Sequence, residues 1–185
     1  WIIQTNGVVQ TLYASVRAFT QPGDNVLLLT PVYYPFYRAV NLNGRKVVES
    51  PIRLVEGRYE VDFDDFEEKA KQCKMFLLCS PHNPMGRVWS EEELCRMGDI
   101  CLKHNVLVVS DEIHFDIIMP GHKHVSYPTL GEKYANNCVM CCAASKTFSL
   151  AGLCVANAII PNSELRDKLN NEVNISGCYT YSIFG

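Results

Sequence analysis

Lys146 has the clearest potential for covalent chemistry in this sequence. It follows Cys-Val-Met-Cys-Cys at 138–142, a run typical of a buried strand, and it stands where that run gives way to a turn. An ammonium group at the end of a buried strand must be paired or neutralised, because burial is costly for a charge and lowers the pKa of a lysine. A neutral lysine amine is a nucleophile that forms a Schiff base with an aldehyde. Taken alone, the segment is better explained by a solvated surface lysine, since most lysines are exposed.

Polar and aromatic residues also follow other apolar segments. The turn Thr-Asn-Gly-Val-Val at 5–9 leads into a helix start whose free amides could hold a phosphate, although many helices begin in this way. Tyr33 places an aromatic ring after the next apolar segment, and packing in the core or a lid explains it equally well. Asn83 lies in Ser-Pro-His-Asn-Pro-Met-Gly at 80–86, where prolines and a glycine fix a rigid loop that presents the amide.

A carboxylate and an imidazole follow a further apolar segment, in Ser-Asp-Glu-Ile-His at 110–114. Asp111 comes after four apolar residues, so it must find a cationic partner or bear the cost of desolvation. The alternatives are a helix cap or a structural ion pair for Asp111, and a hydrogen-bonded core imidazole for His114.

The apolar segments alternate with amphipathic ones along the whole chain. The pattern predicts strands at 1–4, 25–29, 45–49, 74–79, 105–109, 137–142 and 153–160, and helices at 8–19, 34–42, 62–72 and 90–104, with a final helix that starts at Pro-Asn-Ser-Glu, 161–164. The helix at 90 opens with a capping box, Ser-Glu-Glu-Glu. This order predicts an α/β fold, a mainly parallel sheet with helices on both faces. Ligands of such sheets bind outside the carboxyl ends of the strands, so we expect the polar residues described above to meet there.

Together these groups match the requirements of pyridoxal phosphate. Its phosphate needs helix amides, its ring needs a stacking aromatic, and its pyridine nitrogen stays protonated beside a carboxylate. A lysine holds its aldehyde as an imine.

Three motifs carry a resemblance to a known family. Asn-Pro-x-Gly at 83–86, Asp-Glu-Ile-His at 111–114 and Ser-Lys-Thr-Phe at 145–148 stand in the order and spacing of fold-type I pyridoxal-phosphate enzymes. The chain resembles the class I/II aminotransferases, and within them the MalY/PatB branch of cystathionine β-lyase-like C–S lyases. This resemblance implies that residues 1–185 are the central part of the large cofactor-binding domain. It also implies that an N-terminal segment and a C-terminal small domain lie outside this chain.

The resemblance implies a role for each motif residue. Lys146 would hold the cofactor and move the Cα proton, and Asp111 would pair with the pyridinium nitrogen. The remaining expectations are Asn83 on the ring 3′-oxygen with His114 nearby, Tyr33 stacked on the ring, and the amides of Val8 and Val9 with the Ser145 hydroxyl on the phosphate.

Two positions depart from the pattern of the wider family. Many members have a serine three residues before the lysine, where this chain has Ala143, and a basic residue eight after it, where this chain has Cys154. Both residues usually help to hold the phosphate, so part of the phosphate site is unaccounted for. The lyase branch often lacks the basic residue as well.

The resemblance leaves three functions open. The first is a C–S β-lyase acting on cystathionine or a related cysteine S-conjugate, and the second is an aminotransferase. The third is a regulator with this fold or an inactive fragment. If these 185 residues are the whole molecule, we expect weak or no catalysis and exposed apolar surface, because family members form homodimers and use an arginine of the small domain to grip the substrate.

The composition argues against nucleic-acid and membrane partners and indicates a reducing compartment. A net charge of −3 offers no basic face for nucleic acid, and no apolar run approaches the roughly 20 residues that cross a bilayer. Nine cysteines in mostly apolar segments indicate a reduced, cytoplasmic protein rather than a disulfide scaffold. Cys138 and Cys141 should point to opposite faces of a strand and pack in the core. The segment Gly-His-Lys-His at 121–124 is expected to be an exposed loop rather than a metal site.

Overall fold

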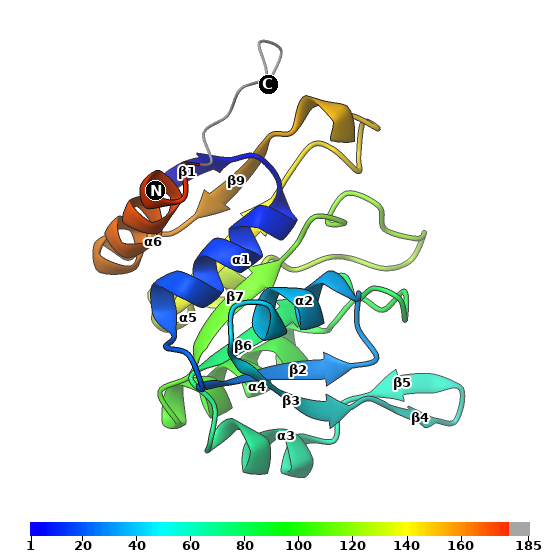
Figure 1. The fold of residues 1–185 in the computed structure, drawn as a ribbon. Helices are drawn as coiled ribbons and strands as arrows, with labels where there is room; N and C mark the ends of the chain where they lie inside the picture. The colour runs from blue at the N-terminus through cyan, green and yellow to red at the C-terminus, as the bar shows by residue number, and fades with distance from the viewer. Residues whose placement is uncertain (178–185) are drawn as a thin grey trace.

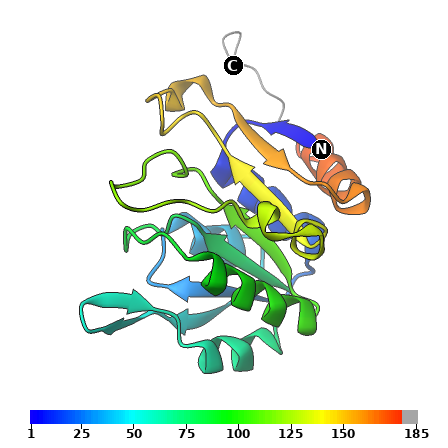
Figure 2. The same ribbon diagram turned by 180° about the vertical axis from the view of Figure 1, so that it is seen from behind.

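The computed structural model describes residues 1–177 as three layers, with helices on both sides of one large sheet (Figures 1 and 2). The strands are β1 (Ile2–Thr5), β2 (Asn25–Thr30), β3 (Lys46–Pro51), β4 (Arg53–Val55), β5 (Arg58–Glu60), β6 (Met75–Cys79), β7 (Leu107–Asp111), β8 (Cys138–Cys142) and β9 (Ala156–Ile159). The helices are α1 (Val8–Phe19), α2 (Pro35–Asn41), α3 (Phe63–Ala70), α4 (Glu91–Lys103), α5 (Glu132–Ala135) and α6 (Ser163–Ile175), with short 3-10 turns η1 (Tyr127–Leu130) and η2 (Ala151–Leu153).

Seven strands form the large sheet, in the order β1-β9-β8-β7-β6-β2-β3. The strands from β8 to β3 pair in parallel, whereas β9 is antiparallel to both of its neighbours. The predicted α/β fold with a mainly parallel sheet is therefore confirmed. Since β1 and β8 both oppose β9, every strand of this sheet except β9 has its carboxyl end at the same edge.

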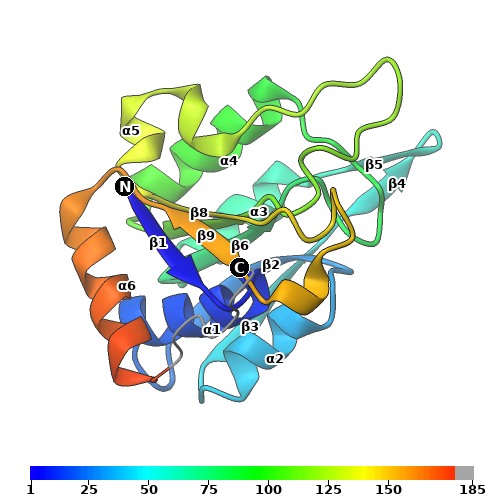
Figure 3. The same ribbon diagram turned by 90° about the horizontal axis from the view of Figure 1, so that it is seen from above.

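The central strands are apolar because both of their faces are covered. Helices α1, α2 and α6 pack on one face and α3, α4 and α5 on the other, as Figure 3 shows from above. Alternate residues of β6 divide between the two cores, with Leu77 facing α1 and Phe76 facing α3 and α4. Cys138 and Cys141 likewise enter opposite cores, as predicted from their spacing.

The fold differs from the sequence prediction in several places, and the short elements η1, α5 and η2 are among those not predicted. Residues 53–60 form the β4–β5 hairpin, which was not predicted because its strands are only three residues long and mostly exposed, with no long run of apolar residues. Strand β7 extends through Asp111 instead of ending at 109, because Asp111 pairs with Cys79 on β6 and with Cys141 on β8. The capping box of α4 is present as predicted, between Ser90 and Glu93.

Loop 113–126 leaves the end of β7 and projects from the same end of the sheet as the turn after β8 (Figures 1 and 2). The prediction of an exposed segment at 121–124 is right for its first three residues and wrong for His124. The Nε2 atom of His124 lies 2.8 Å from Oε2 of Glu112, which draws the imidazole inward. Within residues 1–177, no three His, Cys, Asp or Glu side chains are placed to hold a metal ion.

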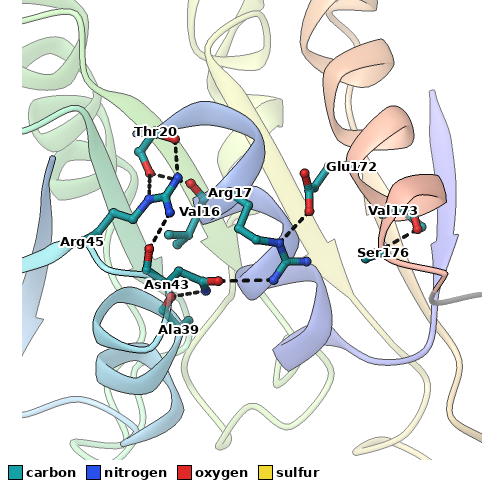
Figure 4. A network of polar contacts seen from close by, with 9 residues as sticks. All are labelled: Val16, Arg17, Thr20, Ala39, Asn43, Arg45, Glu172, Val173 and Ser176. Atoms are coloured by element: carbon teal, nitrogen blue, oxygen red, sulfur yellow. Dashed lines mark hydrogen bonds and ion pairs between the residues drawn. The ribbon is translucent and has the colours of Figure 1, made fainter. Parts of the chain in front are cut away.

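Helix α1 is fixed at its carboxyl end by a polar network (Figure 4). Arg17 donates from Nε to Glu172 of α6 at 2.6 Å and from Nη1 to Asn43 at 3.4 Å. Arg45 donates from Nε to the Thr20 hydroxyl at 2.9 Å, next to the last residue of α1. These contacts tie the carboxyl end of α1 to α6 and to the start of β3, and so fix the direction in which its amino end points.

None of the helices described here is long and apolar enough to span a bilayer.

We predict that Gly98→Ala destabilises the fold. A Cβ atom at this position of α4 would lie 2.7 Å from the Tyr127 hydroxyl and 2.7 Å from the Tyr134 ring. Overpacking of a core typically costs about 1–3 kcal/mol, which exceeds the roughly 1 kcal/mol that alanine gains over glycine in a helix. Urea denaturation should therefore give a lower free energy of unfolding.

Gly152→Ala is the matched control, because a Cβ there meets nothing within 4 Å. It should change the free energy of unfolding by less than about 0.5 kcal/mol. Equal or greater stability of Gly98→Ala would contradict the packing at this contact.

Candidate active site

A pocket of about 240 Å³ opens at the edge of the sheet where the parallel strands end. It brings together all eight residues that sequence analysis selected, and these are Val8, Val9, Tyr33, Asn83, Asp111, His114, Ser145 and Lys146. They come from five separate segments of the chain, each of which directly follows β1, β2, β6, β7 or β8 or ends one of them. The pocket therefore depends on the parallel order of the sheet.

The amino end of α1 forms one side of the pocket. The helix begins at Val8 after Gly7, whose φ of 153° lies in the region that favours glycine. No side chain caps this helix, so the first amides, those of Val8 and Val9 among them, are free of a side-chain acceptor. Their N–H groups and the positive end of the helix dipole suit an anion.

Asp111 forms the base of the pocket. Its side chain is 5% exposed and lies between Cys79 and Cys141 in the register of the sheet. The Ile113 amide donates to Oδ1 at 3.1 Å, and no cation of the described residues lies within ion-pair distance of the carboxyl. The expected cationic partner is thus missing from residues 1–177. Burial raises the pKa of Asp111 from 3.8 to about 7, against the lowering effect of that hydrogen bond and of Lys146.

Lys146 lies beside the pocket in the turn that follows β8. Its side chain is exposed, in agreement with the interpretation of this segment alone as a solvated surface lysine. The strand ends at Cys142, and the chain has already reached the surface at Ala144. The turn is held to loop 113–126, since the Thr147 hydroxyl donates to Oδ2 of Asp116 at 2.8 Å.

Tyr33 and Asn83, which both line the pocket, are joined through their backbones. The Tyr33 amide donates to the Asn83 carbonyl at 3.0 Å, and the Asn83 amide donates to Sγ of Cys79 at 3.3 Å. The loop around Asn83 is further fixed by Trp89, whose indole N–H donates to the Cys79 carbonyl at 2.9 Å. The side chains of Tyr33 and Asn83 therefore project from a rigid frame.

His114 is half-buried and lines the same pocket. Burial lowers its pKa, and the positive charge of Lys146 lowers it further. The imidazole is accordingly neutral at pH 7 and can donate from one nitrogen while it accepts at the other.

The pocket also contains residues that sequence analysis did not select. Ile113, Ala151 and Val155 add apolar walls, and no local pattern in the sequence indicates them. Cys154 lines the pocket and has a left-handed backbone, with φ at 52°. Ala143 is buried in the core, one residue before the turn that begins at Ala144, and it does not line the pocket. A serine side chain at this position would therefore start in the core and not in the turn.

Asp111→Asn is predicted to remove a pH-dependent loss of stability in the ligand-free protein. The folded pKa of about 7 lies above the value of 3.8 for a free carboxyl, so the folded state binds the proton more tightly. The free energy of unfolding of the wild type therefore falls as the pH rises from about 4 to 7 and stays low above that. Asparagine keeps an acceptor for the Ile113 amide without a charge, so the variant should gain roughly 2–3 kcal/mol relative to wild type between pH 5 and pH 8.

Urea denaturation at the two pH values measures this gain. Asp167→Asn, at an exposed position of α6, is the control and should show little change with pH. The same difference between Asp111→Asn and wild type at both pH values would contradict the burial of an uncompensated carboxyl.

Comparisons with known proteins identify the family of this chain. The sequence profile of the family "Aminotransferase class I and II" matches residues 2–178. Cystathionine beta-lyase PatB of Bacillus subtilis is 45% identical over 173 residues, which cover 92% of this chain and 45% of PatB. Protein MalY of Escherichia coli is 32% identical over 168 residues, which cover 90% of this chain and 42% of MalY.

A solved structure with a closely similar fold supports the same family assignment. The crystal structure of cystalysin from Treponema denticola, which contains a pyridoxal 5′-phosphate cofactor, superposes with a TM-score of 0.97 at 41% identity, over 100% of this chain and 47% of that one. The chain spans about half the length of the relatives it matches. From its sequence and its fold alike, the chain belongs to the class I and II aminotransferase family.

Proposed function

We propose that this chain forms the cofactor-binding part of a pyridoxal 5′-phosphate-dependent carbon–sulfur β-lyase. Its substrates are cystathionine or related cysteine S-conjugates, and its products are a thiol, pyruvate and ammonia. The observation that carries the proposal is the meeting of Lys146, Asp111 and the first amides of α1 around one pocket. The similarity to PatB, a cystathionine β-lyase, supports the reaction class, and the cofactor of the cystalysin structure supports the ligand.

The residues of the pocket fit the three chemically distinct parts of this cofactor. The phosphate would bind the amides of Val8 and Val9 at the uncapped start of α1. The ring nitrogen, when protonated, supplies the cation that the buried carboxyl of Asp111 lacks among the described residues. The aldehyde reacts with an amine, and Lys146 presents one that forms no ion pair within residues 1–177.

The reaction assigns a task to each side chain. When bound, the cofactor acts as an electron sink for the negative charge that develops at the substrate Cα. Lys146 would hold the cofactor through its amine, and the same amine, once free, would take the Cα proton of the substrate. Asp111 would keep the ring nitrogen protonated, and Tyr33 would stack on the ring.

Loss of the thiol from Cβ completes the elimination. Water then converts the remaining three-carbon fragment to pyruvate and ammonia, so cysteine S-conjugate and water balance thiol, pyruvate and ammonium. Asn83 would bind the ring 3′-oxygen beside the neutral imidazole of His114, and Ser145 would add its hydroxyl to the phosphate.

We further propose that the chain is part of the large domain of a cytoplasmic homodimer. The eight cysteines within the described residues are all free, which is typical of a reducing compartment. The length of the relatives supports the assignment to one domain of a longer protein.

Lys146→Ala tests the attachment of the cofactor. Wild-type protein incubated with pyridoxal phosphate should show a visible absorption band, and borohydride reduction followed by peptide mass mapping should place the label on Lys146. The alanine variant should lose both signals, because it has no amine at the pocket.

Lys123→Ala is the matched control, since Lys123 is an exposed lysine of the neighbouring loop and does not line the pocket. It should keep the band and the label on Lys146. A label on a different lysine in wild-type protein would overturn the assignment of Lys146.

Product analysis separates elimination from amino transfer. With cystathionine, the full-length protein should release a thiol and pyruvate, because the sulfur is bonded to Cβ. Methionine is the control substrate, since its sulfur is one carbon further away and cannot leave by β-elimination. An oxo acid that keeps the sulfur side chain, formed from either substrate with a 2-oxo acid acceptor, would instead identify an aminotransferase.

A further inference from the structure

Glu112 is a buried carboxyl group for which the proposed reaction has no use. It is 0% exposed, and both of its carboxyl oxygens accept hydrogen bonds. Oε1 accepts from the Ser110 hydroxyl at 3.0 Å and from the Tyr127 amide at 2.9 Å. Oε2 accepts from Nε2 of His124 at 2.8 Å. A buried carboxylate is tolerated when it is satisfied in this way, and we call these four residues the Glu112 anchor.

The Glu112 anchor lies on the opposite face of the sheet from the pocket. Successive residues of a strand point to opposite faces, so Asp111 points towards the α1 side whereas Ser110 and Glu112 point towards the α4 side. Tyr127 packs in the core of that second side, and none of the four residues of the anchor lines the pocket. Glu112 is therefore next to Asp111 in the chain but lies on the opposite face of the sheet.

The anchor closes loop 113–126 into a ring. Glu112 directly precedes the loop, and His124 and Tyr127 lie at its far end, so the two hydrogen bonds that they donate to Glu112 join the two ends. The side chain of His124 is only 9% exposed, although the residues before it are at the surface. The polar contacts to Glu112 therefore add to the packing of Ile113 and Val125, the first and next-to-last residues of the loop, against the two cores.

The same loop contacts Asp111 and the turn that carries Lys146. Its first amide, that of Ile113, donates to Oδ1 of Asp111 at 3.1 Å. Further along, Asp116 accepts from the Thr147 hydroxyl at 2.8 Å, one residue after Lys146. His114 lies between these contacts, where it lines the pocket and also a neighbouring cavity of about 850 Å³.

We propose that Glu112 is a positioning residue, which closes loop 113–126 and thereby fixes the carboxyl of Asp111 and the turn of Lys146 without touching cofactor or substrate. The reaction that it serves rests on the proposed function. Small displacements matter at such a site, because a shift of about 1 Å in a reacting group can lower a rate by roughly 100-fold. The proposal gives a task to the His-Lys-His segment at 122–124, which the cofactor site leaves unused.

Trypsin tests the closure of the loop in the protein without cofactor. Lys123 is exposed within the loop and has no polar partner in the described structure, so cleavage after it reports release of the loop. His124→Ala should be cut there at least about 10-fold faster than wild type, because proteolysis follows the population of the open form. His124→Gln, whose amide can donate to Glu112, should stay within about 3-fold of wild type, and Lys123→Ala confirms the site of the cut by losing it.

Turnover tests the positioning in the full-length protein loaded with pyridoxal phosphate. With cystathionine, His124→Ala should lower kcat per bound cofactor by about 10- to 100-fold while the dissociation constant of the cofactor changes by less than about 3-fold. His124→Gln should recover most of the rate. Glu112→Gln, which can keep all three contacts when His124 changes its tautomer, should be far more active than Glu112→Ala.

The outcomes separate a positioning role from a purely structural one. A lower melting temperature of His124→Ala with wild-type kcat per bound cofactor would overturn the proposal, and so would unchanged cleavage after Lys123. If Glu112→Ala does not fold, the two His124 variants decide, since each alters only one of the three contacts. Absence of pyruvate from wild-type protein would refute the lyase function, while the cleavage ratio would still decide whether the anchor holds the loop.

Discussion

An uncompensated carboxyl group at the end of β7 is the constraint on which the site depends. Asp111 is 5% exposed, accepts one hydrogen bond from a backbone amide, and has a pKa raised to about 7. A carboxyl in this state destabilises the folded chain at neutral pH unless a cation reaches it. In the proposed enzyme that cation is the protonated ring nitrogen of the cofactor, so the cost of burying Asp111 is recovered as binding free energy.

The parallel sheet is what gathers the remaining groups around this carboxyl. Cys79, Asp111 and Cys141 lie in one row of the register, so the segments that follow β6, β7 and β8 leave the sheet at the same level. Helix α1 presents its amino end above this row, and its direction is fixed by the contacts of Arg17 at the other end. An antiparallel order would have sent half of these segments to the opposite edge.

Most of the site could be predicted from sequence because its residues directly follow the strands that position them. Apolar runs mark the strands, and the polar residue after each run falls at the carboxyl edge whatever the details of packing. The exposure of Lys146 follows the general preference of lysine for the surface, but the direction of its turn could not be predicted, because a buried strand does not determine how the following turn leaves the sheet. The contact between Glu112 and His124 could not be predicted either, because the two residues are 12 positions apart in a loop without periodicity. The left-handed backbone of Cys154 has no signal in the sequence, since glycine or asparagine would be the usual residue there.

The pocket offers little positive charge to the phosphate of the cofactor, so the contacts to the rest of the cofactor must contribute more of the binding. Within the described lining of the pocket, Lys146 is the only lysine or arginine, and Cys154 offers a thiol where a basic residue is common in the wider family. A helix amino terminus carries the equivalent of roughly half a positive charge, which balances only part of a phosphate dianion. The cofactor of the proposed enzyme would therefore be held chiefly at its other two ends, by the covalent bond to Lys146 and by the charge of Asp111. Any disturbance of the loop between Asp111 and the turn of Lys146 should then misalign both groups at once, which is why a carboxyl on the far face of the sheet can matter to a pocket that it never touches.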